Sequence, residues 1–282
     1  ARCCAFVALT AATAGTSAAS HATQSVVYAV AKGRTFVYDA PGGKLAGTLQ
    51  QPSIYDEWVA VDGAQNVYVA ASTGPYGSKN GSIREYAPGS SEPSRVMQNG
   101  KGYINAMAAS NSGEVVTAQG VQEFSTLRFF APGATSPTRT IVSPFGFIPG
   151  AAYEPDGTLW LDGLLADDSY SFGYVPAGGT EVTLVAFPGS PPAGPIVIDP
   201  TGNIVVEARG ALMAYSASGK LQYTVRLAGR PDDITAIALS KTGTILYIAD
   251  PNLQIEEFHF PQGGPPIRAF GQYSTSIATG SI

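Results

Sequence analysis

The sequence predicts an all-β protein, a six-bladed β-propeller built from four-stranded antiparallel blades. Three observations lead to this prediction. An aromatic residue followed by a Pro, Gly or Ser turn recurs about every 41 to 48 residues. A pair of apolar strands joined by a short turn precedes it in the complete units, and each end of the chain carries part of one more unit. Repeats of this length are typical of propeller blades.

The two repeats predict the four strands of each unit. The apolar strand pair supplies the first and second strands, and its copies are 59–69, 107–116, 152–161, 196–206 and 237–248. Gly in these turns provides the positive φ of a tight hairpin. The aromatic-turn repeat ends the third strand and leads into a fourth, and its copies are 38–42, 86–89, 130–133, 174–178, 215–219 and 258–261.

The incomplete units at the two ends predict how the ring closes. Residues 26–30 read as a second strand with no first strand before it, and residues 274–280 read as a first strand and turn with nothing after it. We therefore expect the strand near Ile277 to pair beside the strand that contains Val27. Such closure leaves no open sheet edge between blades, whereas a solenoid would have a capping unit at each end.

The fourth strands are the outer edges of the predicted blades. An arginine lies on four of them: Arg95, Arg139, Arg226 and Arg268. Charge on an edge strand discourages pairing with another chain, so we expect these arginines to be solvated.

Composition and charge limit the function classes. Only 13% of the 282 residues are charged, the formal net charge is −5, and no basic cluster is present. A nucleic-acid-binding surface needs a basic stripe, so this class is excluded. Residues 23–282 are expected to form a single propeller domain, with no membrane span and no helix of useful length.

The first 22 residues resemble a secretory signal peptide. Arg2 precedes an apolar stretch that begins at Cys3, and Ser20-His21-Ala22 is a small-x-small cleavage site. The apolar stretch is too short to cross a bilayer. Both cysteines, Cys3 and Cys4, lie in this segment, so the mature protein would have no thiol for a disulfide or a zinc site. The expected location is extracellular or periplasmic, and an unstructured Ala/Ser tail is the alternative.

Two segments carry a family resemblance. Residues 236–250 and 199–204 resemble the blade signature of NHL-type and gluconolactonase-like (TolB-like) six-bladed propellers, as in secreted bacterial proteins. The resemblance implies an axial divalent metal held by a Glu, an Asn and an Asp at the starts of inner strands. Glu57 could supply the Glu, but Thr235 stands where the Asn is implied, and Gly194 or Pro195 where the Asp is implied. We therefore predict no catalytic residue and no metal site of this type.

The loops that enter the first strands form the candidate ligand-binding surface. They lie on the face opposite the uniform Gly-turn hairpins, and variable loops on a rigid scaffold are where function concentrates. Their acidic and aromatic character suggests a polyhydroxylated or cationic ligand, since aromatics suit sugar or peptide contacts. The alternative is that the acidic residues only cap the inner strands. The candidate residues are Tyr55, Asp56, Glu57, Trp58, Tyr103, Asn105, Arg230, Asp232 and Asp233.

No cofactor is predicted. Asp167-Asp168 and Asp250-Pro251-Asn252 could offer oxygen ligands to calcium, but neither has the spacing of a dedicated calcium loop. Turn formation and capping by Asp and Asn are favoured for both segments.

Three function classes remain open. The leading hypothesis is a secreted, non-catalytic ligand-binding or scaffold propeller whose partner is a small molecule, a glycan or a peptide or protein. The second is a gluconolactonase-like, metal-dependent hydrolase or lactonase with an altered site. The third is a structural subunit of an extracellular assembly.

The signal-peptide interpretation predicts that the exported protein begins near Thr23. N-terminal sequencing of protein recovered from outside the cell or from the periplasm measures this directly. A mature chain that still contains Cys3 and Cys4 would contradict the prediction.

Overall fold

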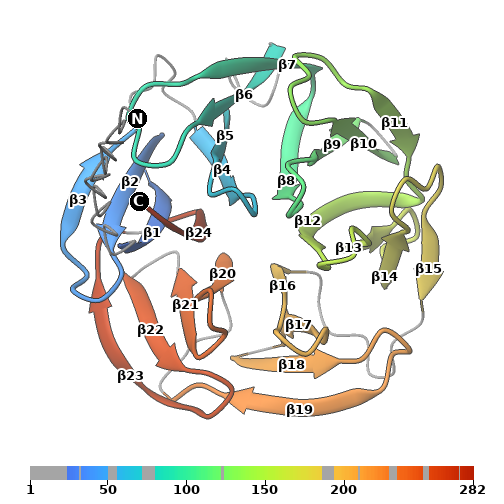
Figure 1. Ribbon diagram of the computed structural model, residues 1–282. Helices are drawn as coiled ribbons and strands as arrows, with labels where there is room; N and C mark the ends of the chain where they lie inside the picture. Colours follow the sequence, from blue (N-terminus) through green and yellow to red (C-terminus); the bar gives the residue numbers. More distant parts are fainter. Residues whose placement is uncertain are drawn as a thin grey trace, which may run out of the picture.

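The computed structural model describes residues 24–31, 33–49, 56–71, 80–121, 124–185, 194–208, 210–228, 234–249, 254–272 and 274–282. These residues form six four-stranded antiparallel sheets arranged as a ring around one axis (Figure 1). The predicted fold class is therefore confirmed. Within the ranges just given there is no helix long and apolar enough to cross a membrane.

The blades follow one another around the ring in chain order. Blade 1 contains β24 (Ser276–Ser281), β1 (Ser25–Ala31), β2 (Arg34–Asp39) and β3 (Leu45–Thr48). Blade 2 contains β4 (Asp56–Val61), β5 (Val67–Ala71), β6 (Asn80–Tyr86) and β7 (Arg95–Lys101). Blade 3 contains β8 (Tyr103–Ala109), β9 (Val115–Val121), β10 (Phe124–Phe130) and β11 (Arg139–Val142).

The second half of the ring repeats this order. Blade 4 contains β12 (Phe145–Tyr153), β13 (Leu159–Leu165), β14 (Tyr170–Val175) and β15 (Thr183–Val185). Blade 5 contains β16 (Ile196–Ile198), β17 (Ile204–Glu207), β18 (Ala211–Tyr215) and β19 (Leu221–Arg226). Blade 6 contains β20 (Ala236–Leu239), β21 (Ile245–Ala249), β22 (Ile255–His259) and β23 (Gly263–Phe270).

The ring closes by pairing the last strand with the first. β24 runs antiparallel to β1, with Ala29 opposite Ile277 and Val27 opposite Thr279. The predicted closure is confirmed, and blade 1 is the blade that both ends of the described chain share.

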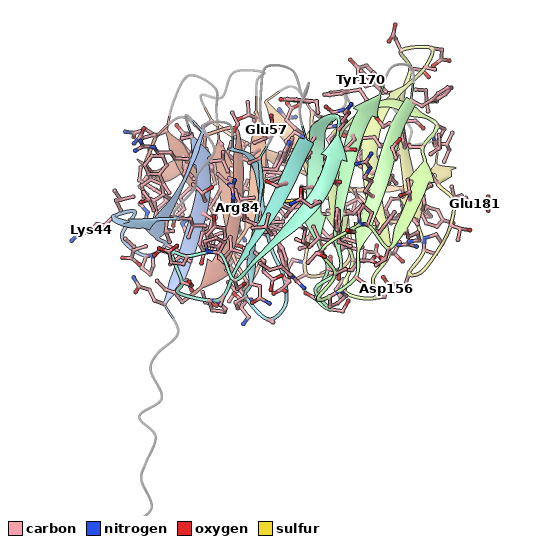
Figure 2. The ribbon with its side chains drawn as sticks, turned by 90° about the horizontal axis from the view of Figure 1, so that it is seen from above. Lys44, Glu57, Arg84, Asp156, Tyr170 and Glu181 are labelled. Atoms are coloured by element: carbon pink, nitrogen blue, oxygen red, sulfur yellow. The ribbon has the colours of Figure 1, made fainter. Side chains whose placement is uncertain are left out.

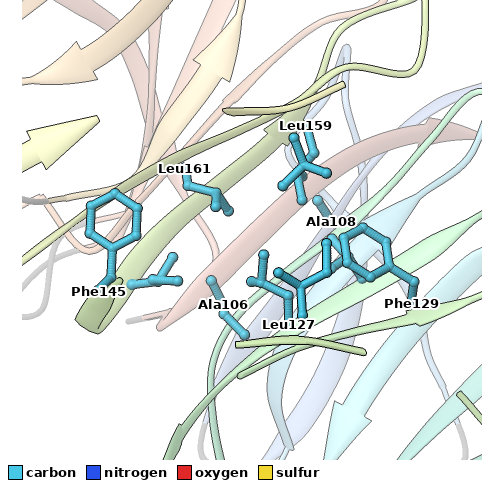
Figure 3. Close-up of a cluster of buried hydrophobic side chains, with 12 residues drawn as sticks. Ala106, Ala108, Leu127, Phe129, Phe145, Leu159 and Leu161 are labelled. Atoms are coloured by element: carbon cyan, nitrogen blue, oxygen red, sulfur yellow. The ribbon is translucent and has the colours of Figure 1, made fainter. Parts of the chain in front are cut away.

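Neighbouring blades pack face to face through apolar side chains. Figure 3 shows one such cluster, in which Ala106 and Leu127 of blade 3 meet Phe145 and Leu161 of blade 4. In blade 3 the inner strand β8 contributes the small Ala106 and Ala108, while Leu127 and Phe129 lie further out on β10, which suits the wedge shape of the space between two blades. Burying such a Leu or Phe side chain contributes about 1.5–3 kcal/mol, so each interface of this kind stabilises both blades.

A polar side chain secures the hairpin between the first and second strands at the same position in several blades. The Ser110 hydroxyl accepts the Glu114 N–H at 3.0 Å, and the Ser240 hydroxyl accepts the Ile245 N–H at 3.1 Å. The Asp62 carboxylate accepts the Asn66 N–H at 2.8 Å. The Asp or Ser before the hairpins of blades 2, 3 and 6 is thus a folding feature, as expected for turn residues of this kind.

Asp199 is the most extensively bonded of these hairpin residues. Its carboxylate accepts hydrogen bonds from the backbone N–H groups of Thr201 and Asn203 at 2.8 and 2.9 Å and from the Tyr223 hydroxyl at 2.5 Å. Burial by itself raises the pKa of Asp199, but the hydrogen bonds outweigh it and hold that pKa below its usual value.

Three of the four edge arginines are not simply solvated, and the sequence-based expectation is wrong for them. Arg139 lies over the Phe129 ring of its own blade and donates to the Gly179 carbonyl in the turn of blade 4. Arg268 pairs with Glu257 of its own blade and donates to the Ala40 carbonyl in the turn of blade 1.

The same arrangement recurs at a third blade boundary, where Arg95 pairs with Glu85 and lies next to Gly133 in the turn of blade 3. Arg226 is exposed, as expected. The difference arises because the turn of the next blade approaches the outer strand, a contact that local sequence cannot show.

Replacing the Asp199 carboxylate should destabilise the fold. We expect Asp199→Ala to lower the free energy of unfolding by about 2 kcal/mol, because several partly buried donors lose the buried carboxylate that accepts from them. Since the pKa of Asp199 is lowered by folding, this loss should be full at neutral pH and shrink as the pH falls below about 4. Urea unfolding at several pH values measures it.

Asp156→Ala is the matched control for this measurement. Asp156 also lies in a hairpin between first and second strands, but it is exposed and accepts the Thr158 N–H at 2.8 Å. Its substitution should cost less than about 1 kcal/mol. Equal losses for the two variants would contradict the role given to Asp199.

Candidate functional site

The two faces of the ring differ in the way that strand polarity predicts. Figure 2 shows the ring from its side, with Glu57 and Tyr170 toward one face and the hairpin residue Asp156 toward the opposite face. We call the face where β4, β8, β12 and β14 begin the upper face. The candidate residues that the structure describes all come from its strand starts.

The inner strands enclose a small cavity on the ring axis. Its volume is about 70 Å³, and none of the described residues that line it is charged. The axial position follows because all six inner strands contribute to its wall. The lining residues are Trp58, Val59, Met107, Pro149, Gly150, Ala151, Pro195, Ile196, Ala236, Ile237, Ser276 and Ile277.

Glu57, Trp58 and Tyr103 lie together where blade 2 meets blade 3. The Trp58 indole N–H donates to the Ile104 carbonyl at 2.8 Å, which ties β4 to β8. Burial, and then the nearby Glu57 carboxylate, raise the pKa of the Tyr103 phenol. Tyr103 is 44% exposed, so its ring is available at the surface while its hydroxyl stays neutral near Glu57.

Three adjacent inner strands carry a β-bulge near the upper face. The pairing of β4 with β5 shifts at Glu57, and the pairing of β8 with β9 shifts at Asn105. The pairing of β12 with β13 shifts between Phe145 and Phe147 and again before Gly150. In the described residues, β16 and β20 pair without a shift. Bulges re-aim side chains and occur preferentially at the rims of closed sheets and next to functional sites.

Asn105 is not available to a ligand, contrary to the expectation from the sequence. It lies within β8 and is 6% exposed. It is the extra residue of the bulge, and its side chain occupies the space over Gly120, where a Cβ would come within 2.8 Å of the Asn105 amide nitrogen. The bulge turns the residue inward, and no local signal in the sequence indicates it.

The remaining candidates are only partly described. Asp56 is the first residue of β4, and its side chain lies outside the described residues. Tyr55, Arg230, Asp232 and Asp233 lie outside them altogether.

Further aromatic side chains are exposed on the same side of blades 3 and 4. Phe147 of β12 is 42% exposed, and Tyr170, the first residue of β14, is 44% exposed. Neither is among the candidate residues predicted from the sequence, because their exposure depends on the bulge in β12 and on the hairpin that precedes β14. Together with Tyr103 they give the upper face three half-exposed rings on two adjacent blades.

The positions implied for metal ligands have other roles. The Thr235 hydroxyl lies between the carbonyl oxygens of Ala249 and Ser274, at 3.1 and 3.0 Å. The Gly194 N–H donates to the Asp162 carboxylate at 3.0 Å. Among the residues that the structure describes, no group of three or more His, Cys, Asp or Glu side chains is arranged to hold a metal ion.

Asp167 serves as a turn residue. Its carboxylate accepts hydrogen bonds from the Ser169 hydroxyl and backbone N–H, at 2.5 and 3.1 Å, and these bonds lower the pKa of Asp167. Asp168 adopts a positive φ of 62° in the same turn. The other candidate calcium segment, Asp250-Pro251-Asn252, lies outside the described residues.

Asp162 is a fully buried carboxyl directly behind the axial cavity. It lies on β13, and a Cβ at Gly150 would lie 3.2 Å from the Asp162 Cβ and 2.3 Å from the Gly194 carbonyl oxygen. Glycine at position 150 therefore permits the close approach of blades 4 and 5. Burial raises the pKa of Asp162 well above its usual range; backbone hydrogen bonds oppose this rise, and the Glu207 charge adds to it.

Comparisons with known proteins support the fold and nothing finer. No family model matches the sequence, and the curated proteins contain no match. Among solved structures, a chain of hydrazine synthase from Kuenenia stuttgartiensis is similar, with a TM-score of 0.59 and 14% sequence identity. The similarity covers 80% of this chain and 70% of that chain. At this sequence identity the similarity shows a shared propeller architecture only. It does not indicate a shared function, because one fold hosts many functions.

The raised pKa of Asp162 predicts a pH-dependent stability. A carboxyl whose pKa is raised by folding contributes its full stability below its unfolded pKa of about 3.9, and that contribution is lost as the pH rises toward the folded pKa. Asp162→Asn cannot lose a proton and keeps an oxygen for the Gly194 N–H. The variant should therefore gain stability relative to the native chain as the pH rises, by up to about 1.4 kcal/mol per pH unit between the two pKa values.

Urea unfolding of both proteins between about pH 4 and pH 9 measures this difference. At the acidic end the two unfolding free energies should agree within about 1 kcal/mol. A difference that does not change with pH would show that the carboxyl ionises equally easily in the folded and unfolded chains.

Proposed function

We propose that this protein is an exported, non-catalytic binding propeller of the NHL or gluconolactonase-like type, and that its upper face binds a polyhydroxylated ligand such as a glycan. The observation that carries the proposal is the coincidence of three half-exposed aromatic rings with three β-bulges on the adjacent blades 2, 3 and 4. Both features concern the same face and the same half of the ring.

The chemistry of this surface suits a sugar. Tyr103, Phe147 and Tyr170 present apolar ring faces that can stack on the C–H face of a pyranose, and the tyrosines add a hydroxyl for hydrogen bonding. The Glu57 carboxylate lies near Tyr103 and gives this part of the face a negative charge. A phosphate would instead be repelled by that charge.

The scaffold holds these groups in place before a ligand arrives. The hydrogen bond from Trp58 to Ile104 joins blade 2 to blade 3 directly beside Tyr103. Strands packed on both sides allow little movement of the residues at their ends, so less conformational entropy is lost on binding. The site is therefore described better as a preformed platform than as a flexible loop.

The same observations favour binding over the lactonase alternative. Of the positions implied for axial ligands, Thr235 makes hydrogen bonds to backbone carbonyls and Gly194 has no side chain. The cavity on the axis is small and none of the described residues that line it is charged, whereas hard divalent cations are held by several oxygen ligands. Glu57 then fits a role in ligand recognition on the upper face, near Tyr103.

A melting-shift screen with neutral and amino-sugar oligosaccharides tests the proposal. A ligand present at about 100 times its Kd should raise the unfolding free energy by about 2.7 kcal/mol. The double variant Tyr103→Ala and Tyr170→Ala should weaken binding at least tenfold, because both stacking rings are removed.

Ile267→Ala is the control variant. Ile267 is 43% exposed, similar to Tyr103, but it lies on the outer strand of blade 6. The Ile267→Ala variant should bind the oligosaccharide with the affinity of the native chain. Unchanged affinity in a correctly folded Tyr103 and Tyr170 double variant would rule out the upper face of blades 3 and 4.

A further inference from the structure

A separate groove lies on the outer rim between blades 3 and 4. Its volume is about 450 Å³, within the range of sites that take a small molecule or a few side chains. It is formed by residues near the start of β10, the end of β11 and the beginning of β15. The lining residues are Phe124, Val142, Ser143, Pro144, Glu181, Val182 and Leu184.

The groove concentrates apolar side chains that the rest of the rim shows only singly. Val142 is 72% exposed, and Phe124 and Leu184 are each 45% exposed. Elsewhere on the described outer strands, large exposed apolar residues occur one to a blade, and such single exposed residues are ordinary. A group of three from three strands around one hollow marks an interaction site.

The size of the groove indicates what kind of partner it fits. A stable interface between two globular proteins uses about 20–30 residues from each side. Among the residues that the structure describes, seven line this groove, so it suits a short segment better than a folded surface.

The negative charge of Glu181 indicates that the partner segment carries a basic residue. Glu181 is the one charged residue of the lining; it is exposed at the outer rim (Figure 2) and makes no ion pair or hydrogen bond within the described part of the chain. A second copy of this chain would bring like charges together, since each copy carries a formal net charge of −5. A basic side chain would instead complement Glu181.

The backbone beside the groove favours an extended partner. β11 and β15 are the outermost strands of their sheets, so neither has a second neighbour in its described sheet. Edge strands accept an added strand, whose side chains alternate with a period of two.

We propose that this rim groove docks an extended segment of a partner protein that carries two apolar side chains two residues apart and a nearby Lys or Arg. The apolar side chains enter the hollow between Val142 and Leu184, and the basic one pairs with Glu181. The site is distinct from the glycan platform of the upper face.

The test uses a defined set of labelled peptides of the form Φ-Thr-Φ-Thr-Lys, in which Φ is Val, Leu, Ile or Phe, and a matched set ending in Glu. Fluorescence anisotropy with the full-length protein should show saturable binding of at least one Lys peptide and at least tenfold weaker binding of its Glu counterpart. Glu181→Lys should reverse that preference. Because Glu181 is exposed, this variant should fold normally.

Leu184→Asp should weaken binding of the same peptide at least tenfold, whereas Leu221→Asp should leave its affinity unchanged. Leu221 is the matched control, since it is 44% exposed on the outer strand of blade 5. The proposal is overturned if no peptide in the set binds, or if the two Asp variants bind equally well. It is also overturned if sedimentation shows a dimer that Leu184→Asp dissociates, which would make the groove a contact between copies. Oligosaccharide binding should persist in Leu184→Asp, so the two proposals can fail separately.

Discussion

Each blade of this propeller depends on its two neighbours, because its sheet is apolar on both faces and must bury both. The described residues form six apolar clusters, and each cluster spans one boundary between adjacent blades. Blade 6, for example, shares one cluster with blade 5 and another with blade 1. A ring is the arrangement in which no sheet is left with an uncovered face, so the pairing of β24 with β1 completes the burial of every blade.

Polar contacts reinforce the same boundaries. The Ser276 hydroxyl accepts the Val59 N–H at 3.1 Å, and the Thr279 hydroxyl donates to the Leu239 carbonyl at 2.6 Å, so the closing strand is bonded to the blade on each side. Toward the periphery, Arg139 and Arg268 extend from one blade to the turn of the next. Such arginines combine a guanidinium–aromatic or carboxylate contact within one blade with donation to carbonyls of another, which lysine could not do with the same geometry.

This construction separates the parts of the molecule that hold the fold from those free to serve a function. The hairpin face is uniform, because Asp or Ser residues secure the same turn in blade after blade. The upper face is irregular, with bulges in β4, β8 and β12 and exposed aromatic rings beside them. A bulge weakens the local ladder, and the rigid ring around it makes that cost tolerable.

The sequence alone determined the fold class, the number of blades, the closing strand pair and the face on which the candidate site lies. These features can be predicted from local repeats, because the apolar strand segments and the turn residues recur within each unit. It also predicted that Glu57, Trp58 and Tyr103 share one face of the ring, because each stands where an inner strand begins.

Only the tertiary structure decided which side chains are accessible. The bulge at Asn105 turns that residue inward, and close packing against Gly194 buries Asp162. Contacts with the turn of the next blade and with neighbouring side chains keep Arg95, Arg139 and Arg268 from being fully solvated. Each of these outcomes depends on residues of another strand or another blade, and the chain does not encode such contacts in any local pattern.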